Sequence, residues 1–326
     1  MSNQNLIAPV SGTEVPRFAG SSNFARVPSI DQVGDYDVAI LGAPFDSGTS
    51  YRPGARFGPL AVRVASRHLR PAYHPDLAVA PFELLQVVDA GDVPVNPFVI
   101  DEAMVQIEGH ASELVRDRSR LITIGGDHSV ALPLLRAVHR VHGPVALVHF
   151  DAHLDTWDTY FGAPLTHGTV FRRAFEEGLL IEDHSVHVGI RGPLYGASDL
   201  SDDARFGFQV IRAADLDKLG FDEVVNRIRE RVDGYPIYLS VDIDVLDPAF
   251  APGTGTPEVG GFTSRELLRL LRRLDGLPLV GADVVEVSPS YDVAEITALA
   301  AATVIYDVLS LMARELKSST TTNDSI

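Results

Sequence analysis

The chain has 326 residues, of which 45% are hydrophobic and 22% charged, the balance of a globular protein with a buried core. Its 44 acidic and 27 basic residues give a formal net charge of −17, which argues against nucleic acid or an anionic membrane as a partner and favours small cationic ligands. The chain has no cysteine, so disulfides, thiolate metal ligands and cysteine nucleophiles are excluded.

Residues 1–35 are rich in Ser, Pro, Gly and Asn and predict an N-terminal arm, whereas the polar residues 317–326 predict a disordered tail. Between them, residues 36–316 predict a single domain in which short apolar runs alternate with amphipathic segments. The predicted strands cover 38–43, 84–88, 121–124, 145–150, 186–190, 208–211, 237–241 and 279–287. The predicted helices cover 59–66, 100–116, 131–141, 169–177, 221–232, 264–274 and 295–316.

Strands that are apolar throughout and alternate with helices predict a mostly parallel sheet covered on both faces. We therefore expect a three-layer α/β/α fold with about eight central strands. The N-terminus shows no basic stretch followed by a long apolar core, so no signal peptide is predicted. No uninterrupted apolar run approaches the ~20 residues that a membrane span needs. We therefore expect a cytoplasmic protein.

Three of the predicted strands are followed by clusters of hard metal ligands: G-G-D-H at 125–128, D-A-H-L-D at 151–155 and S-V-D-I-D at 240–244. Ligands of parallel sheets bind beyond the carboxyl ends of the strands, so two imidazoles and four carboxylates are expected to meet there. A donor set rich in oxygen and free of sulfur favours manganese over zinc, with nickel, cobalt or iron as replacements.

The spacing within the D-A-H-L-D cluster limits which of its residues can bind the same ion. On an extended segment Asp151, His153 and Asp155 point to one side, with alternate residues ~6.6 Å apart. Asp155 would then lie ~13 Å from Asp151, too far to share one ion. If both bind the same metal, the chain has to curl sharply after His153.

The other two clusters complete the predicted donor set. Asp242 and Asp244 repeat the alternate spacing on a second strand, and His128 follows a Gly-Gly turn. A carboxylate has two oxygens, so Asp151 and Asp242 are natural shared ligands of two ions. A lone buried His or Asp is more often a satisfied core residue, but six of them at three strand ends argue for ligation.

From about residue 36 to 312 the chain resembles the ureohydrolase family, the arginases and agmatinases, and most closely the agmatinases. Besides the clusters G-G-D-H and D-A-H-L-D, the resemblance is carried by four motifs, one of which extends the S-V-D-I-D cluster. They are G-A-P-F-D-S-G-T-S-Y-R-P-G-A-R-F-G-P at 42–59, T-H-G-T at 166–169, S-V-D-I-D-V-L-D-P-A-F-A-P-G-T-G-T-P at 240–257 and E-V-S-P-S-Y-D at 286–292.

The resemblance implies an arginase-like fold, two Mn²⁺ ions per chain and a homo-oligomer, a hexamer or trimer. It implies that a metal-bridging hydroxide attacks a guanidinium group and releases urea and an amine. One ion is assigned to His128, Asp151, Asp155 and Asp242, and the other to Asp151, His153, Asp242 and Asp244.

The resemblance also assigns three residues to the reaction. Asp155 would move the proton of the attacking oxygen, and Glu286 would hold the guanidinium by charge-assisted hydrogen bonds. His167 would shuttle protons near the substrate. From position alone, Glu286 could equally be a solvated carboxylate at a strand end, and His167 an ordinary satisfied polar residue.

The loop at 156–166, T-W-D-T-Y-F-G-A-P-L-T, bears on the substrate. Arginases carry Asn and Ser in this loop to bind the amino-acid carboxylate, and neither occurs here. Asp158 is predicted to face a distal cation, and Trp157, Tyr160 and Phe161 to line a methylene chain, although each aromatic ring can equally pack at a subunit interface. The prediction is agmatine, cleaved to putrescine and urea in polyamine biosynthesis.

Other readings remain open at this point. Hydrolases of 4-guanidinobutyrate or 3-guanidinopropionate share the metal motifs but need a partner for a carboxylate, and nothing in the spacing decides whether Arg52 or Arg56 meets a substrate or a subunit. A dinuclear phosphatase would want basic residues around the metals, and a one-metal deacetylase would lack the paired histidines. A non-catalytic metal-binding protein would tolerate the loss of a ligand or of Glu286, and none is missing.

Overall fold

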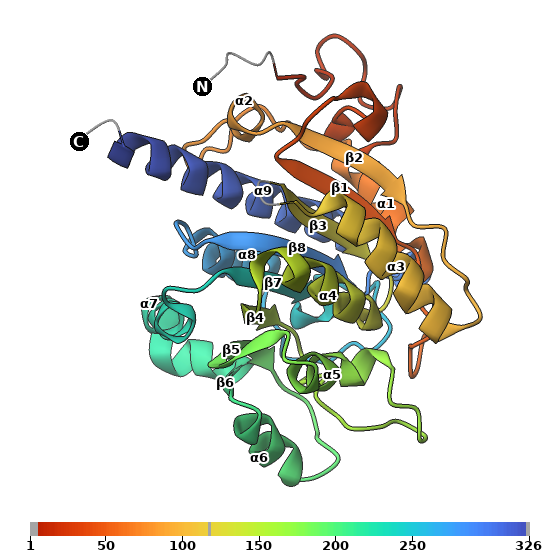
Figure 1. The fold of residues 1–326 in the computed structure, drawn as a ribbon, viewed down its shortest axis with the longest axis vertical. Helices are drawn as coiled ribbons and strands as arrows, with labels where there is room; N and C mark the ends of the chain where they lie inside the picture. Colours follow the sequence, from red (N-terminus) through yellow and green to blue (C-terminus); the bar gives the residue numbers. More distant parts are fainter. Residues whose placement is uncertain (1–5, 117–118, 324–326) are drawn as a thin grey trace.

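The computed structural model describes residues 6–116 and 119–323, and its centre is an eight-stranded sheet in the order β2-β1-β3-β8-β7-β4-β5-β6 (Figure 1). Every pair of neighbouring strands is parallel. The strands are β1 Val38–Ala43, β2 Val87–Asp92, β3 Arg120–Gly125, β4 Val145–Phe150, β5 Leu180–Ile190, β6 Phe208–Arg212, β7 Ile237–Asp242 and β8 Leu279–Val285. The predicted α/β class is therefore confirmed.

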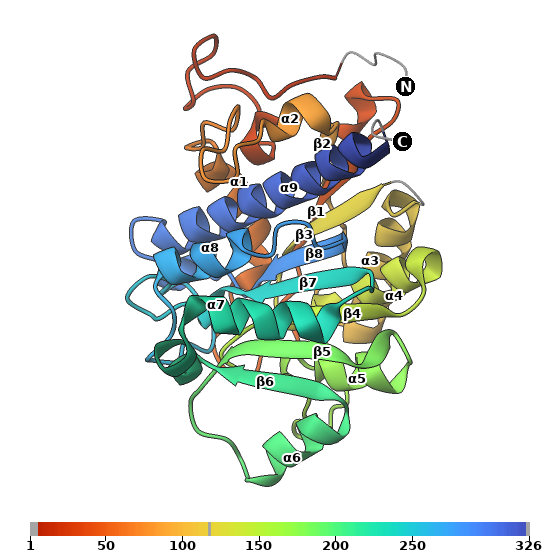
Figure 2. The same ribbon diagram turned by 90° about the vertical axis from the view of Figure 1, so that its left-hand side faces the viewer.

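Helices cover both faces of the sheet (Figure 2). The α-helices are α1 Gly58–Ser66, α2 Pro81–Leu84, α3 Ile100–Leu114, α4 Ala131–His142, α5 Val170–Glu176, α6 Ser198–Arg205, α7 Ala213–Val232, α8 Ser264–Arg272 and α9 Ile296–Asn323. The 3₁₀ helices are η1 Phe24–Arg26, η2 Ile30–Gln32, η3 Ala55–Phe57, η4 His128–Val130, η5 His167–Thr169, η6 Ile243–Val245 and η7 Pro289–Tyr291.

Two hydrophobic clusters form the core, one on each face of the sheet. Val38 and Ile40 of β1 pack into the cluster that contains α1, α7, α8 and α9, whereas Ala39 and Leu41 pack into the cluster of α3, α4 and α5. Successive strand residues point to opposite faces, so a strand buried on both sides has to be apolar at every position. This is why the strands read as continuous apolar runs.

The structure differs from the predicted elements where apolar periodicity is absent or misleading. The segment 84–88 is not one strand: α2 ends at Leu84 and β2 begins at Val87, because a proline at the first position starts a helical turn. The acidic helix α6 was not predicted. Helix α7 begins eight residues before the predicted 221, across a break at Gly220, whose φ is +76°.

The prediction of a disordered tail from residue 317 is wrong as far as Asn323, where helix α9 ends; residues 324–326 lie outside the described part. Extending a helix that already exists avoids the cost of nucleation, which a composition argument ignores. The segment Ile296–Lys317 is long and apolar enough to cross a membrane, but 78% of its most apolar stretch is buried inside the protein. This burial is typical of a core helix.

The described part of the predicted arm is attached to the domain. The amide of Ile7 donates to Gln86 Oε1 (2.8 Å), and Val10 donates to the carbonyl of Arg26 (3.1 Å). Residues 1–5 lie outside the described part.

The strand order brings the functional segments together. In the middle of the sheet β3, β8, β7 and β4 are consecutive neighbours, so the segments that follow β3, β7 and β4 leave the same edge, with the end of β8 between two of them. After β3 the chain passes so close to the segment after β1 that a Cβ on Gly126 would lie 1.9 Å from the carbonyl oxygen of Phe45. Only glycine fits there.

Candidate metal centre and active site

His128, at the start of η4, lies at the centre of a first group of carboxylates. Its Nδ1 is 3.2 Å from Asp151 Oδ2, 3.0 Å from Asp155 Oδ2 and 3.3 Å from Asp242 Oδ2. The imidazole is fully buried, and Nδ1 has no hydrogen-bond partner in the described part of the chain. A buried nitrogen without a partner, facing three carboxylates, fits a metal ligand.

A second group shares one residue with the first. His153 Nδ1 lies 3.3 Å from Asp151 Oδ1 and 3.2 Å from Asp244 Oδ2. Asp151 therefore offers one oxygen to each group. Ligand atoms of His128, His149, Asp151 and Asp155 lie within 4.8 Å of one another, as do those of Asp151, His153 and Asp244, which is close enough to hold an ion in each place. Asp242 Oδ1 accepts the amide of Asp244 (2.8 Å), so Asp242 approaches the first group with Oδ2 and contacts the second through the backbone.

The sharp curl expected after His153 is present. Asp155 has a φ of +55°, a conformation that costs a non-glycine residue energy and clusters at functional sites. This turn returns the Asp155 carboxylate to the nitrogen that Asp151 also faces. The predicted consequence of a shared ion is thus found in the backbone.

The buried carboxylates of the two groups repel one another, so the site favours a bound positive charge. Burial raises the pKa of Asp242 well above its ordinary value, and Asp244 and Asp151 raise it further. Burial and Asp151 likewise raise the pKa of Asp244 to about 6, against the lowering effect of His153. Burial opposes a charge on His128, but its three carboxylate neighbours raise its pKa well above the ordinary value. Divalent cations would relieve the same repulsion.

Residues behind His128 set its tautomer. Tyr238 and Ser240 donate their hydroxyl hydrogens to the two oxygens of Asp283, each at 2.6 Å. Because the Ser240 hydroxyl is used in this way, its oxygen accepts the Nε2–H of His128 at 2.8 Å. Nδ1 is then left with a free lone pair toward the carboxylates, as a metal-binding histidine requires.

His149, which the sequence reasoning missed, lies beside the first group. Its Nε2 is 2.8 Å from Asp151 Oδ2, and its Nδ1 is 2.6 Å from His187 Nδ1. Burial lowers the pKa of His149 to about 3, so the ring is neutral and has a single N–H. Both nitrogens are engaged, so His149 is a neighbour of the ligands rather than a ligand. Its position two residues before Asp151 on a strand was the available signal.

Glu286 and His167 meet beside the metal ligands. Glu286 Oε1 accepts both the amide of His128 and Nδ1 of His167, each at 2.9 Å. Glu286 directly follows β8 and has a φ of +64°. Its other oxygen, Oε2, is buried and has no hydrogen-bond partner among the described residues. Glu286 is therefore an oriented carboxylate with one free oxygen.

His167 has a partner in either protonation state. Burial would lower its pKa, but Glu286, Asp155 and Asp127 raise it to about 9. When the ring is protonated, Nε2–H can donate to Ser50 Oγ at 2.7 Å; when it is neutral, Nε2 accepts the amide of Ser50 at 3.1 Å. This arrangement suits a residue that gains and loses a proton. Ser50 was not predicted.

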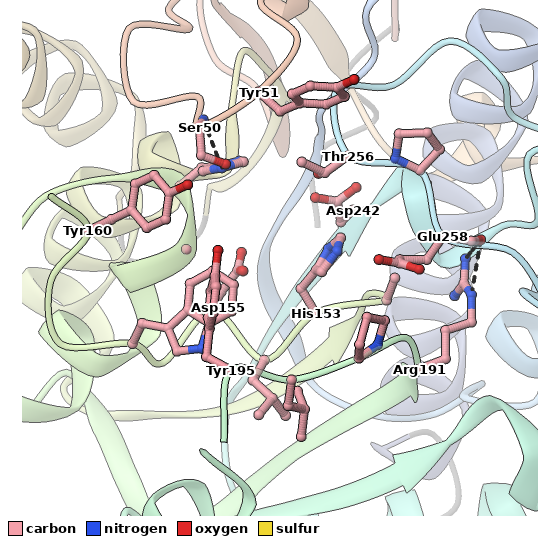
Figure 3. A pocket seen from close by; sticks show the side chains of 18 of the residues that line it. Ser50, Tyr51, His153, Asp155, Tyr160, Arg191, Tyr195, Asp242, Thr256 and Glu258 are labelled. Atoms are coloured by element: carbon pink, nitrogen blue, oxygen red, sulfur yellow. Dashed lines mark hydrogen bonds between the residues drawn. The ribbon is translucent and has the colours of Figure 1, made fainter. Parts of the chain in front are cut away.

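A cavity of about 620 Å³ opens above the ligands (Figure 3). His153, Asp155 and Asp242 line its base, and Tyr160 and Tyr195 line one side. The cavity is therefore continuous with the metal donors and large enough for a small guanidino compound.

Of the predicted substrate contacts, Trp157 lines the cavity. Its ring packs on Gly168, where a Cβ would lie 2.7 Å from Trp157 Cε3. The prediction for Asp158 is wrong: its exposed carboxylate pairs with Arg172 and Arg173 of α5, at 3.4 and 2.9 Å, and it does not line the cavity. Phe161 is 95% exposed and does not line the cavity.

The cavity wall has charges of both signs that sequence reasoning did not place. Glu258 lies on one side (Figure 3), and Arg52 stacks on Tyr51 and Tyr291. Within residues 6–116 and 119–323, neither the Glu258 nor the Arg52 side chain forms an ion pair within 4.0 Å, but Arg191, which also lines the cavity, donates to the Glu258 carbonyl and interacts electrostatically with Glu258. Arg56 pairs instead with the buried Asp46, so of the two arginines in this loop only Arg52 is available to a substrate.

The fold and this site define a metallohydrolase-like centre, and similarity to known proteins agrees. Residues 36–310 match the arginase family, so the chain belongs to that family and is a hydrolase of the ureohydrolase type. It is 46% identical to Putative agmatinase 1 of Schizosaccharomyces pombe, with 91% of this chain and 83% of that protein covered.

Two further relatives differ in the substrates that their names indicate. Guanidinopropionase of Pseudomonas aeruginosa is 46% identical, with 94% of this chain and 96% of that protein covered. The structure of proclavaminate amidino hydrolase from Streptomyces clavuligerus superposes with a TM-score of 0.87 at 43% identity, covering 92% of this chain and 99% of that one. Similar identities across these names leave the substrate to be argued from the site.

Proposed function

We propose that the protein is a dimanganese hydrolase that cleaves the guanidinium group of agmatine to putrescine and urea. The observation that carries the metal part is the division of Asp151 between two donor groups, Oδ2 toward His128 and Oδ1 toward His153. The donors are carboxylates and imidazoles without sulfur, which suits Mn²⁺, with Ni²⁺, Co²⁺ or Fe²⁺ as replacements. His128, Asp151, Asp155 and Asp242 would hold one ion, and Asp151, His153, Asp242 and Asp244 the other.

When bound, the two ions would supply a nucleophile at neutral pH by lowering the pKa of water between them. The remaining work falls to protein groups. Asp155 belongs to the first donor group and lines the cavity, so its carboxylate is within reach of both nucleophile and substrate. It would accept the proton of the nucleophile and pass it to the departing nitrogen.

Glu286 and His167 would orient the guanidinium. The free Oε2 of Glu286 can accept a charge-assisted N–H bond from the substrate, while Oε1 is held by His128 and His167. Burial of Glu286 strengthens this contact because little water competes with the substrate. His167, with Ser50 as a partner in both protonation states, would return a proton to the amine product.

Agmatine is favoured by the carboxylate of Glu258 in the cavity wall. Its distal ammonium would meet Glu258, while Trp157 and Tyr160 would flank its methylene chain. The net charge of −17 draws cations in the same sense. One observation favours a second candidate, a guanidino acid such as 4-guanidinobutyrate or 3-guanidinopropionate: the Arg52 guanidinium in the same wall could bind its carboxylate.

A substrate panel tests the proposal. Urea release by the Mn²⁺-loaded protein is measured with agmatine, arginine, 4-guanidinobutyrate and 3-guanidinopropionate, and kcat/KM is expected to be highest for agmatine. A higher kcat/KM for either guanidino acid would contradict agmatine as the substrate but would still support hydrolysis of a guanidinium group. Two bound ions with no urea from any substrate would support a non-catalytic metal-binding protein instead.

We further infer a cytoplasmic homo-oligomer, a trimer or hexamer. Light scattering on the purified protein is expected to give a mass of three or six chains, and a monomer at assay concentration would contradict it.

A further inference from the structure

Helix α6 carries a carboxylate, Asp203, that is buried in the protein interior. The helix reads S-D-L-S-D-D-A-R and lies beyond the edge strand β6 (Figures 1 and 2). Asp203 is its one buried residue, and that side chain is fully buried. Removing a carboxylate from water is unfavourable unless polar partners compensate. The helix therefore docks on the protein through a charged group that needs specific partners inside.

Those partners form a chain that ends at the metal ligands. Asp203 Oδ1 lies 3.3 Å from His187 Nε2 on β5, and His187 Nδ1 lies 2.6 Å from His149 Nδ1 on β4. His149 Nε2 is in turn 2.8 Å from Asp151 Oδ2. All four side chains are fully buried. A continuous polar chain thus crosses two strands, from a peripheral helix to the carboxylate that both donor groups share.

The direction of the hydrogen bonds follows from the two ends. A carboxylate accepts, so His149 donates Nε2–H to Asp151. The neutral His149 then has only an acceptor at Nδ1, which takes the Nδ1–H of His187. His187 Nε2 lies 3.3 Å from Asp203 Oδ1, a polar contact without a hydrogen bond. The hydrogen bonds from His187 to His149 and from His149 to Asp151 therefore orient the shared carboxylate, as outer partners orient metal-binding carboxylates and histidines.

Asp203 reaches the ligand loop by a second route. Its Oδ1 also accepts the hydroxyl of Thr156 at 2.8 Å. Thr156 directly follows Asp155, whose left-handed backbone returns its carboxylate to His128, and precedes Trp157 in the cavity wall. Asp203 thus contacts the pair of imidazoles that ends at Asp151 and, through its hydrogen bond with Thr156, holds the residue next to Asp155.

We propose that His187, Asp203 and Thr156 are positioning residues of the metal centre, which fix the shared ligand Asp151 and the turn at Asp155 and so set metal affinity. The proposal rests on the metal centre proposed above. A purely structural reading, in which the chain only fills the space beside Phe171 and Phe208, predicts a loss of stability without a selective loss of metal.

The experiment measures the affinity of the metal-free protein for Mn²⁺, with free ion followed by its electron paramagnetic resonance signal. His187→Leu removes the donor to His149 and is expected to weaken binding about 10–100-fold. His187→Asn places an amide nitrogen where Nδ1 was and is expected to recover most of the affinity. Rescue by a donor of similar position is not expected if the residue only fills space.

A matched control separates metal affinity from stability. His74 is also buried and bonded to an aspartate, Asp307, at 2.8 Å, with Arg272 as a remaining partner of that aspartate. His74→Leu is expected to lower the melting temperature and leave Mn²⁺ affinity unchanged. Equal affinities for His187→Leu and His74→Leu would overturn the proposal. Failure of the wild-type protein to bind Mn²⁺ would instead overturn the proposed metal centre.

Should His187→Leu not fold, Thr156 provides the second test. Thr156→Val removes the hydroxyl that donates to Asp203 while keeping the shape of the side chain, and Thr156→Ser restores the hydroxyl. Mn²⁺ affinity is expected to fall at least about threefold in the first variant and to return in the second. Equal affinity in both would overturn the proposal.

Discussion

Glu286 and His167 are joined at 2.9 Å through Glu286 Oε1, the same oxygen that accepts the amide of His128. In the proposed reaction, metal ligation and substrate binding would thus meet at the Glu286 carboxylate, which contacts the proposed ligand His128 through the backbone amide of that residue. Glu286→Ala is expected to lower kcat/KM by a factor of about 10³ or more, because a buried charge opposite the guanidinium is lost. Metal content, measured by elemental analysis, is expected to stay near that of the unmodified protein. Loss of both ions together with activity would contradict this role.

Replacing Asp242 is expected to damage both metal positions. Its Oδ2 belongs to the first group, and its Oδ1 holds the amide of the second-group residue Asp244. An ion that binds only the folded protein adds about 2.7 kcal/mol to the free energy of unfolding when its free concentration is 100 times its Kd. Excess Mn²⁺ should therefore raise the Tm of the wild-type protein clearly and that of Asp242→Ala little. A full rise in the variant would exclude Asp242 as a ligand.

The raised pKa of His167 predicts a pH dependence of stability in the metal-free protein. Its pKa is about 9 in the folded state against about 6.5 when unfolded. The stabilisation is fully present below pH ~6.5 and is lost as pH rises through about 9; it amounts to at most about 3 kcal/mol. The Tm difference between wild type and His167→Gln is expected to shrink from pH 6 to pH 10. A constant difference would contradict the raised pKa.

The two charges in the cavity wall predict opposite effects on opposite substrates. If agmatine is the substrate, Glu258→Gln should raise its KM about tenfold through loss of a charge-assisted contact, while Arg52→Gln should leave KM unchanged or lower it. If a guanidino acid is the substrate, Arg52→Gln is the damaging change. Steady-state kinetics of both variants with agmatine and 4-guanidinobutyrate distinguish the two patterns, and kcat should change less than KM.

Asp158 and Trp157 are neighbours with different expected importance. The Asp158 carboxylate forms exposed ion pairs with Arg172 and Arg173, and such pairs contribute about 0–1 kcal/mol. Asp158→Asn is expected to change kcat/KM less than twofold. Trp157→Ala should raise KM for the preferred substrate, since the ring lines the cavity and packs on Gly168. A large effect of Asp158→Asn on KM would indicate that Asp158 contacts the substrate.

The sequence by itself determined the parallel α/β class and the candidate metal donors. Both depend on local pattern: the strands are apolar at every position because they are buried on both faces, and the donors directly follow β3, β4 and β7. The turn at Asp155 could also be predicted, because an extended chain would place Asp155 too far from Asp151 for both to bind one ion. The missed helix α6 and the extended α9 lacked such a signal, since composition alone describes neither docking nor helix extension.

Only the tertiary structure decided what approaches the donors from other strands and loops. The strand order places Glu286 between the ligand segments, the packing of α5 turns Asp158 outward, and the loop after β1 brings Arg52 and Ser50 to the cavity. The link from Asp203 to Asp151 joins residues 52 positions apart through His187 and His149. Contacts of this kind arise when distant segments share a buried space, and no periodicity along the chain encodes them.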